Sequence, residues 1–269
     1  MGNALFVVWR ESVEAMLVVG ILYAWLKRND PGGRGIRALW LGVGAGIGLA
    51  LALGWAMLAA QSELSGQALE WFQTALVFAA AGLITQMVLW MQSRGREIKK
   101  NLEHDLARAT ERSNWFGVAA IAALAIAREG AETVIFLYGL GLERDGGTGL
   151  AVGALAGFVL AALTAWAAAR GLRFVDYRIF FRVSGLLLLI FAAALLVGGI
   201  ERLIGMGWLP ALIEPLWDSS RLLDDSTTTG RLIAALTGYR AQPSLMLLLI
   251  YVTYWVGVSF AKSRLLRRA

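Results

Sequence analysis

The sequence contains no cysteine and a single histidine, His104, which excludes several kinds of site. The chain cannot form disulfides, thiolate metal sites or iron–sulfur clusters, and zinc or haem sites built on His and Cys are excluded. Charged residues are scarce at 16% of the 269 residues, against roughly 25% in an average soluble domain, whereas apolar residues make up 58%. This composition argues against a soluble globule and excludes a disordered chain, a collagen-like fibre and a coiled coil.

Long apolar runs fill most of the chain. A bilayer core about 30 Å thick needs roughly 20 apolar residues in a helix. The first run has no basic n-region and no A-x-A cleavage site, so we interpret it as a retained helix and not a signal peptide. Seven runs are long enough to span a bilayer, and we expect transmembrane helices over about residues 4–26, 36–60, 69–92, 115–140, 149–169, 180–203 and 244–261.

The basic residues are sorted between alternate loops. Eighteen of the 25 Lys and Arg lie in the segments 27–37, 93–114, 170–182 and 262–268, whereas five lie in the other loops and two inside spans. The positive-inside rule then places the amino terminus outside and the carboxyl terminus in the cytoplasm, which requires an odd number of spans. This sorting explains the net charge of +6 better than nucleic-acid binding, which we do not expect.

Two loops are long enough to hold structure of their own. Residues 93–114 have the pattern of a polar cytoplasmic helix with a narrow apolar stripe (Ile98, Leu102 and Leu106). Residues 204–243 form an outer loop, in which we expect Thr229 to cap a short helix over 230–237 that ends at Gly238.

The first and fourth spans each contain the pattern R-E-x-x-E within apolar sequence. Motif 1 is residues 10–14 and motif 2 is residues 128–132. A charged residue near the centre of a transmembrane helix costs on the order of 2.5–3.5 kcal/mol, so six unpaired charges would cost about 15–20 kcal/mol. Such residues persist where they neutralise one another or bind something.

Helix geometry gives each motif two carboxylates and one guanidinium on one stripe, because positions three and four apart are neighbours. If the stripes face each other, the site has four carboxylates, two guanidiniums and a formal charge of −2. Carboxylates without His or Cys select hard cations such as iron, Mn²⁺, Mg²⁺ and Ca²⁺. The candidate metal ligands are Glu11, Glu14, Glu129 and Glu132, and the residues that compensate their charge are Arg10 and Arg128.

We expect Arg10 and Arg128 to hold the glutamates in the empty state and to yield to an incoming ion. Carboxylates that release protons when metal arrives would make the carrier proton-coupled. The alternatives are a scaffold subunit whose ion pairs only pin helix packing, and a membrane redox enzyme. A di-iron enzyme site would normally contain E-x-x-H motifs, which this chain lacks.

The first and fourth spans are antiparallel copies of one motif, which predicts an inverted repeat. The fold class we expect is an all-α integral membrane protein with seven transmembrane helices, a 3+3 repeat and a C-terminal helix. We expect one permease domain over 1–269, with repeat one at about 4–92, repeat two at about 115–203, an outer loop at 204–243 and a last helix at 244–261. Glycines in spans two and five have the small-xxx-small spacing of close helix contacts: Gly42, Gly44, Gly46, Gly48, Gly153 and Gly157.

Other polar residues could assist the site. Glu70, Glu201 and Asp218 lie on or near the outer side, where acidic groups raise the local cation concentration, and they are candidate entrance or accessory residues. Polar residues within spans, such as Thr85, Tyr138 and Tyr254, are better explained by helix–helix hydrogen bonds than as ligands.

The paired motifs resemble those of the oxidase-dependent iron permease family, which includes fungal high-affinity iron permeases and bacterial EfeU-type and FtrC-type permeases. The outer stretch from Trp217 to Ser244 is also similar to that family's last outer loop. The resemblance covers essentially the whole chain.

The resemblance implies a permease, not an enzyme, in the cytoplasmic (inner) membrane. The implied substrate is an iron ion, Fe²⁺ or Fe³⁺, with the motif glutamates as ligands and no catalytic cofactor. The implied partners are the lipid bilayer and a separate extracytoplasmic iron oxidase or iron-delivery protein, and a homo-oligomer is compatible with the sequence. Transport of another metal, such as Mn or Pb, is the alternative within the same family.

Overall fold

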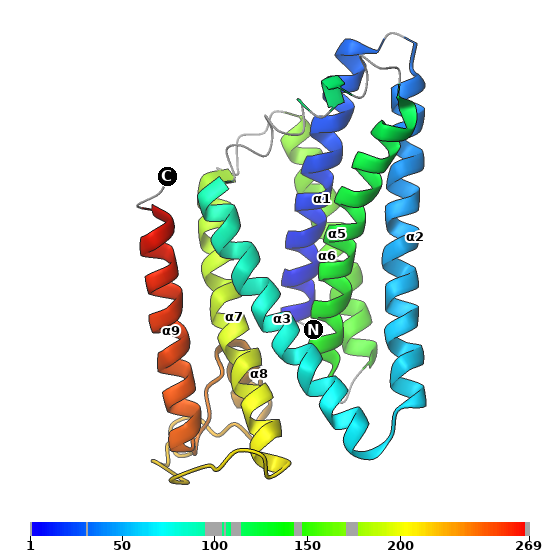
Figure 1. The fold of residues 1–269 in the computed structure, drawn as a ribbon. Coiled ribbons are helices and arrows are strands. Elements are labelled where there is room, and N and C mark those ends of the chain that lie inside the picture. The colour runs from blue at the N-terminus through cyan, green and yellow to red at the C-terminus, as the bar shows by residue number, and fades with distance from the viewer. Residues whose placement is uncertain are drawn as a thin grey trace. The chain divides into compact units, whose positions relative to one another are not determined.

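The computed structural model describes residues 2–30, 32–94, 104, 106–108, 114–142, 147–170 and 177–266. Within these residues all regular structure is helical (Figure 1). The helices are α1 (Gly2–Asn29), α2 (Arg34–Glu63), α3 (Gly66–Arg94), α5 (Trp115–Leu142), α6 (Gly147–Ala169), α7 (Tyr177–Gly205), α8 (Thr228–Thr237) and α9 (Leu245–Leu266).

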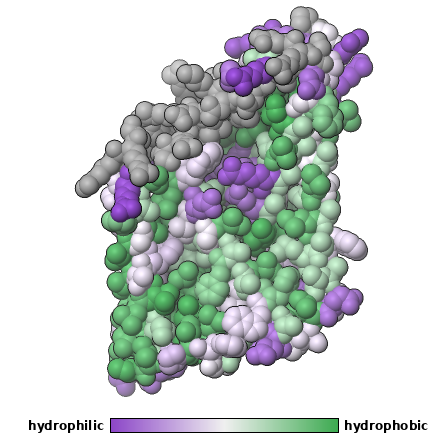
Figure 2. Space-filling model, in the orientation of Figure 1, coloured by the Kyte–Doolittle hydropathy of each residue, from purple (hydrophilic) through white to green (hydrophobic). Residues whose placement is uncertain are grey.

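Each of the seven predicted spans coincides with one long helix. Five of these helices, namely α2, α3, α6, α7 and α9, are long and apolar enough to cross a membrane. Hydrophobic residues accordingly cover most of the helical surface drawn in Figure 2. Helices α1 and α5 have 28 residues each, but each contains the three charges of one motif. That α1 and α5 also cross the membrane stays a prediction, as do the repeat and the orientation of the termini.

The long helices divide between two compact units. Unit 1 contains α1, α2, α5 and α6, and unit 2 contains α3, α7, α8 and α9. Each unit therefore combines helices from both predicted repeats. The two motifs lie together in unit 1, so the candidate site can be described within one unit.

In unit 1, α2 packs closely against α5 through glycines. A Cβ atom on Gly42 would lie 2.2 Å from the Ala119 carbonyl oxygen, and one on Gly46 would lie 2.7 Å from the Ala123 carbonyl oxygen. Contacts advance along both helices in the same direction, so α2 and α5 are parallel. Helices α1 and α2 run side by side in opposite directions in Figure 1, so α1 and α5 are antiparallel.

Helix α6 packs on α1, and the two lie side by side in Figure 1. As between α2 and α5, a glycine allows the close contact. A Cβ atom on Gly157 would lie 2.4 Å from the Leu5 carbonyl oxygen. The Trp9 indole N–H also donates a 3.1 Å hydrogen bond to Thr164 Oγ1. The opening helix of each predicted repeat therefore packs on the second helix of the other.

The ends of α1, α2 and α5 opposite the amino terminus enclose a buried apolar cluster that includes Leu22, Leu26, Leu39 and Val118. Leu106, one of the three residues of the predicted apolar stripe, is fully buried in the same cluster. Ile98, Leu102 and most of the predicted helix over 93–114 lie outside the described residues.

In unit 2, side-chain hydrogen bonds join helices that are far apart in the sequence. The Tyr254 hydroxyl on α9 lies 3.0 Å from Thr85 Oγ1 on α3 and 3.1 Å from the Leu189 carbonyl oxygen on α7. Between α7 and α3, Arg202 Nη1 donates a 3.0 Å hydrogen bond to Gln73 Oε1. These contacts tie α3, α7 and α9 together.

The short helix in the outer segment is α8, and its predicted N-cap is wrong by two residues. Thr227, not Thr229, is the N-cap residue, because its Oγ1 accepts a 3.1 Å hydrogen bond from the Gly230 N–H. Thr229 lies within the first turn. The predicted end at Gly238 is confirmed, with φ at 74°, a conformation that glycine adopts without steric cost.

Candidate metal centre

Motif 1 places two carboxylates and one guanidinium in the interior of unit 1. The Arg10 and Glu11 side chains are 1% and 0% exposed, and that of Glu14 is 13% exposed. Arg10 Nη1 lies 2.9 Å from Glu11 Oε1, and Arg10 Nη2 lies 2.7 Å from Glu14 Oε1. The predicted arginine–glutamate pairing is therefore present, and one guanidinium bridges both acids of the motif.

Motif 2 makes the corresponding pair on α5 in a different environment. Arg128 Nε donates a 3.0 Å hydrogen bond to Glu132 Oε1, one helical turn away. The Arg128 side chain is 48% exposed, whereas that of Glu132 is 11% exposed. The two motifs thus share an internal geometry but differ in how far their arginines are buried.

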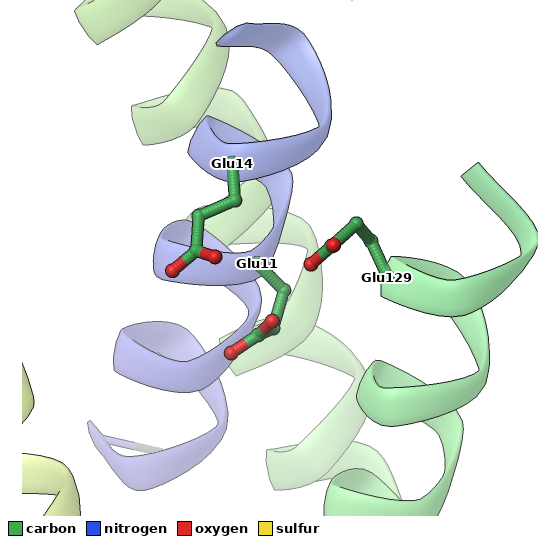
Figure 3. A group of neighbouring side chains, drawn as sticks. All are labelled: Glu11, Glu14 and Glu129. Carbon is green, nitrogen blue, oxygen red and sulfur yellow. The ribbon is translucent and has the colours of Figure 1, made fainter. Parts of the chain in front are cut away.

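The two motifs face each other. Glu11 and Glu14 on α1 and Glu129 on α5 each contribute one carboxylate oxygen to a group in which all three atoms lie within 4.8 Å of one another. Figure 3 shows Glu129 reaching from α5 towards the two acids of α1. Glu132, the fourth predicted ligand, lies outside this group of three.

Several carboxylate oxygens at the site are buried without a partner. Among the described residues, no hydrogen-bond partner is present for Glu11 Oε2, Glu129 Oε2 or Glu132 Oε2. A buried carboxylate oxygen that makes no hydrogen bond is costly, because desolvation is not compensated. These atoms can act as ligands without first breaking a bond within the protein.

The charge of the site favours a cation. Three converging carboxylates and the bridging Arg10 give a formal charge of −2, and the Arg128–Glu132 pair adds no net charge. All the available donor atoms are oxygens, which are the ligands that hard divalent and trivalent cations prefer. The arrangement can hold a metal ion and offers no His or Cys for a softer one.

The three candidate entrance residues all belong to unit 2. Glu70 is exposed on α3, and Glu201 on α7 forms an ion pair with Arg240 that engages both carboxylate oxygens. Asp218 is exposed in the outer segment, where it accepts a 2.9 Å hydrogen bond from the Ser220 N–H and a 3.0 Å bond from Gln242 Nε2. Hydrogen bonds from Ser220 and Gln242 lower the pKa of the Asp218 carboxyl, which keeps it anionic.

Three polar residues of the predicted spans, Thr85, Tyr138 and Tyr254, make the expected helix–helix contacts. Tyr138 on α5 donates to Gln61 on α2, and Thr85 pairs with Tyr254. Every member of the carboxylate group is among the residues that the sequence singles out. The unequal burial of the two arginines carries no sequence signal, because helix periodicity gives both motifs the same internal spacing.

Comparisons with known proteins agree with the motifs. Residues 1–266 match the model of the Iron permease FTR1 family. The chain is 29% identical over 252 residues to the ferrous iron permease EfeU of Yersinia pestis, covering 93% of this chain and 89% of that one. It is 30% identical over 260 residues to the proteins of the same name from Shigella sonnei and Escherichia coli O157:H7, covering 94% and 92%.

No solved structure matches the chain. The match to the family model nonetheless extends over nearly every residue. Membership implies a transporter and not an enzyme. The chain belongs to the Iron permease FTR1 family, and it is a multi-pass integral protein of the inner membrane.

Proposed function

We propose that this protein moves iron ions across the cytoplasmic membrane through the three converging carboxylates on α1 and α5. The observation that carries the proposal is the convergence of Glu11, Glu14 and Glu129, whose nearest oxygens lie within 4.8 Å of one another. Unpartnered carboxylate oxygens in an apolar surrounding are explained by a cation that spends part of its time among them. The transported iron is the substrate, and no catalytic cofactor is part of the proposal.

In this proposal seven helices cross the membrane. Each motif places three charges within a continuous apolar helix. The ion pairs within the motif partly neutralise these charges, which lowers the free-energy cost of inserting α1 and α5 into the bilayer. The antiparallel course of α1 and α5 supports an inverted repeat with the site at the interface of the repeats. The sorting of basic residues supports an outside amino terminus and a cytoplasmic carboxyl terminus.

Iron is proposed as the substrate because the family is named for it and the relatives are named ferrous iron permeases. The oxygen ligands by themselves suit Fe²⁺, Fe³⁺ and Mn²⁺ alike. The extracytoplasmic oxidase or delivery protein and a homo-oligomer stay predictions that rest on the resemblance alone.

The experiment is uptake of ⁵⁵Fe²⁺ by proteoliposomes under anaerobic, reducing conditions, with Mn²⁺ and Pb²⁺ as competitors. We expect uptake by the wild-type protein and background uptake by Glu14→Gln and Glu129→Gln, because the carboxamide keeps the shape of the side chain but loses its charge. Unchanged uptake by both variants, reconstituted in equal amounts, would rule out this site. If Mn²⁺ is transported faster than iron, the substrate is Mn²⁺ and not iron.

A further inference from the structure

The two arginines of the motifs are equivalent in sequence but not in structure. Arg10 is buried, with 1% of its side chain exposed, and contacts two carboxylates. Arg128 has 48% of its side chain exposed, and its Nε atom pairs with Glu132 Oε1. This difference bears on which arginine can move when an ion enters.

Arg10 holds the acids of motif 1 in a fixed relation. Its two Nη atoms contact Oε1 of Glu11 at 2.9 Å and Oε1 of Glu14 at 2.7 Å. The guanidinium is a rigid planar fork, so it sets the separation of the two carboxylates as well as neutralising one charge. Moving it would leave a buried cation without compensation, which is strongly unfavourable. Displacing Arg10 when a metal ion binds would therefore be costly.

Arg128 is less enclosed by the protein than Arg10. Almost half of its side chain is exposed, so packed neighbours do not hold it beside Glu132 as closely as they hold Arg10 beside its two acids. Glu132 has a second oxygen, Oε2, that is buried without a hydrogen-bond partner. Glu132 also lies three residues after Glu129, so the two share a face of α5.

We infer that the two arginines have different tasks in the proposed iron site. Arg10 is a positioning residue that fixes Glu11 and Glu14 as a preformed pair. Arg128 is a releasable counter-ion whose departure adds Glu132 to the ligands of the ion. The inference rests on the proposed function and replaces the expectation that both arginines yield.

A positioning role and simple electrostatics predict opposite changes in metal affinity when Arg10 is removed, and this difference provides the test. Removing a positive charge beside a cation site should raise metal affinity for either arginine. If Arg10 positions two ligands, Arg10→Gln instead lowers affinity, by about 10–100-fold as for other groups that orient metal ligands. Arg128→Gln raises affinity severalfold, because Glu132 is then free.

The measurement is calorimetric titration of the purified full-length protein in lipid nanodiscs with Fe²⁺ under anaerobic conditions. Arg240→Gln is the matched control, since it removes a paired arginine from unit 2, and its Fe²⁺ affinity should equal that of the wild type. Arg10→Lys should also bind Fe²⁺ weakly, because one ammonium cannot reproduce the contact of the guanidinium with two carboxylates. Most of the gain from Arg128→Gln should disappear in the Glu132→Gln background.

The outcomes separate this inference from the proposed function. Wild-type protein that binds no Fe²⁺ contradicts the proposed function itself. Wild-type binding with tighter binding in both arginine variants overturns the division of tasks. If circular dichroism and gel filtration show that Arg10→Gln is misfolded, the measurements on Arg128→Gln decide. An Arg128→Gln gain that is absent, or that persists without Glu132, then overturns the inference.

Discussion

Units 1 and 2 both contain acid–arginine contacts, but they use their carboxylates differently. In unit 2 the guanidinium of Arg240 engages both oxygens of Glu201. In unit 1 the arginines contact Oε1 of Glu11, Glu14 and Glu132, whereas Oε2 of Glu11 and Glu132 has no hydrogen-bond partner among the described residues.

This difference separates structural acids from candidate ligands. A carboxylate whose two oxygens are both engaged by a guanidinium has little capacity left for a metal ion. A carboxylate with a buried, unpartnered oxygen is costly for the fold, and a bound cation compensates that cost. The Glu201–Arg240 contact joins the outer segment to α7, and the unpartnered oxygens of motifs 1 and 2 support the proposal that those acids bind the transported ion.

The largest expected effect is the loss of iron uptake when one carboxylate charge is removed from unit 1, compared with removal of one from unit 2. Glu129→Gln should reduce iron uptake by more than the roughly 10–100-fold typical of groups that only orient ligands. Glu201→Gln, the matched control, should retain most of the wild-type uptake. Uptake of ⁵⁵Fe²⁺ by proteoliposomes, normalised to reconstituted protein, checks both variants. Equal losses in the two variants would remove the distinction between the units.

A smaller effect is expected from the glycine contacts that bring α2 against α5. Gly46→Ala should destabilise the protein by about 1–3 kcal/mol through overpacking, because its Cβ would lie 2.7 Å from the Ala123 carbonyl oxygen. Gly44→Ala is the matched control, since nothing lies within 4 Å of its Cβ position. Thermal melting of both variants in detergent gives the comparison, and equal melting temperatures would contradict the packing.

The Glu201–Arg240 pair should affect stability and spare transport. Arg240→Gln is expected to lower the free energy of unfolding by about 1 kcal/mol or less, because both side chains are partly exposed and solvent screens the pair. Faster proteolysis of the outer segment at unchanged iron uptake is the expected signature. Lost uptake at unchanged proteolysis would instead place this pair in the transport path.

The smallest expected effect concerns the hydroxyl that joins α9 to α3 and α7. Tyr254→Phe removes the contacts to Thr85 Oγ1 and the Leu189 carbonyl oxygen. Hydrogen bonds between membrane helices contribute about 0.6 kcal/mol on average, so the melting temperature should fall slightly while iron uptake stays constant. A loss of uptake would make Tyr254 more than a helix–helix contact.

Much of the fold could be predicted because apolar length alone defines the long helices. The predicted span over 115–140 corresponds to α5 at Trp115–Leu142, and the one over 36–60 corresponds to α2 at Arg34–Glu63. Which helices pack together could not be predicted in this way. Gly42, Gly44 and Gly46 look alike in sequence, yet only the first and third contact α5. Close approach depends on helix rotation, which an evenly apolar helix does not encode.

The candidate site was predictable at the level of its residues. Two R-E-x-x-E motifs in apolar spans identify the acids, because helix periodicity places residues three and four apart on one face. The exposure of Arg128 and the position of Glu132 outside the group of three were not predictable. Both depend on which neighbouring helix covers each side chain, and that is a property of tertiary packing.

The proposed transport requires that an iron ion binds between the acids of α1 and α5. Anomalous scattering measured at the iron edge from crystals of the Fe²⁺-bound protein tests it most directly. We expect one strong peak within coordination distance of Glu11, Glu14 and Glu129, and a much weaker peak in Glu129→Gln crystals. A peak beside Glu201 or Asp218 with none between α1 and α5 would contradict it.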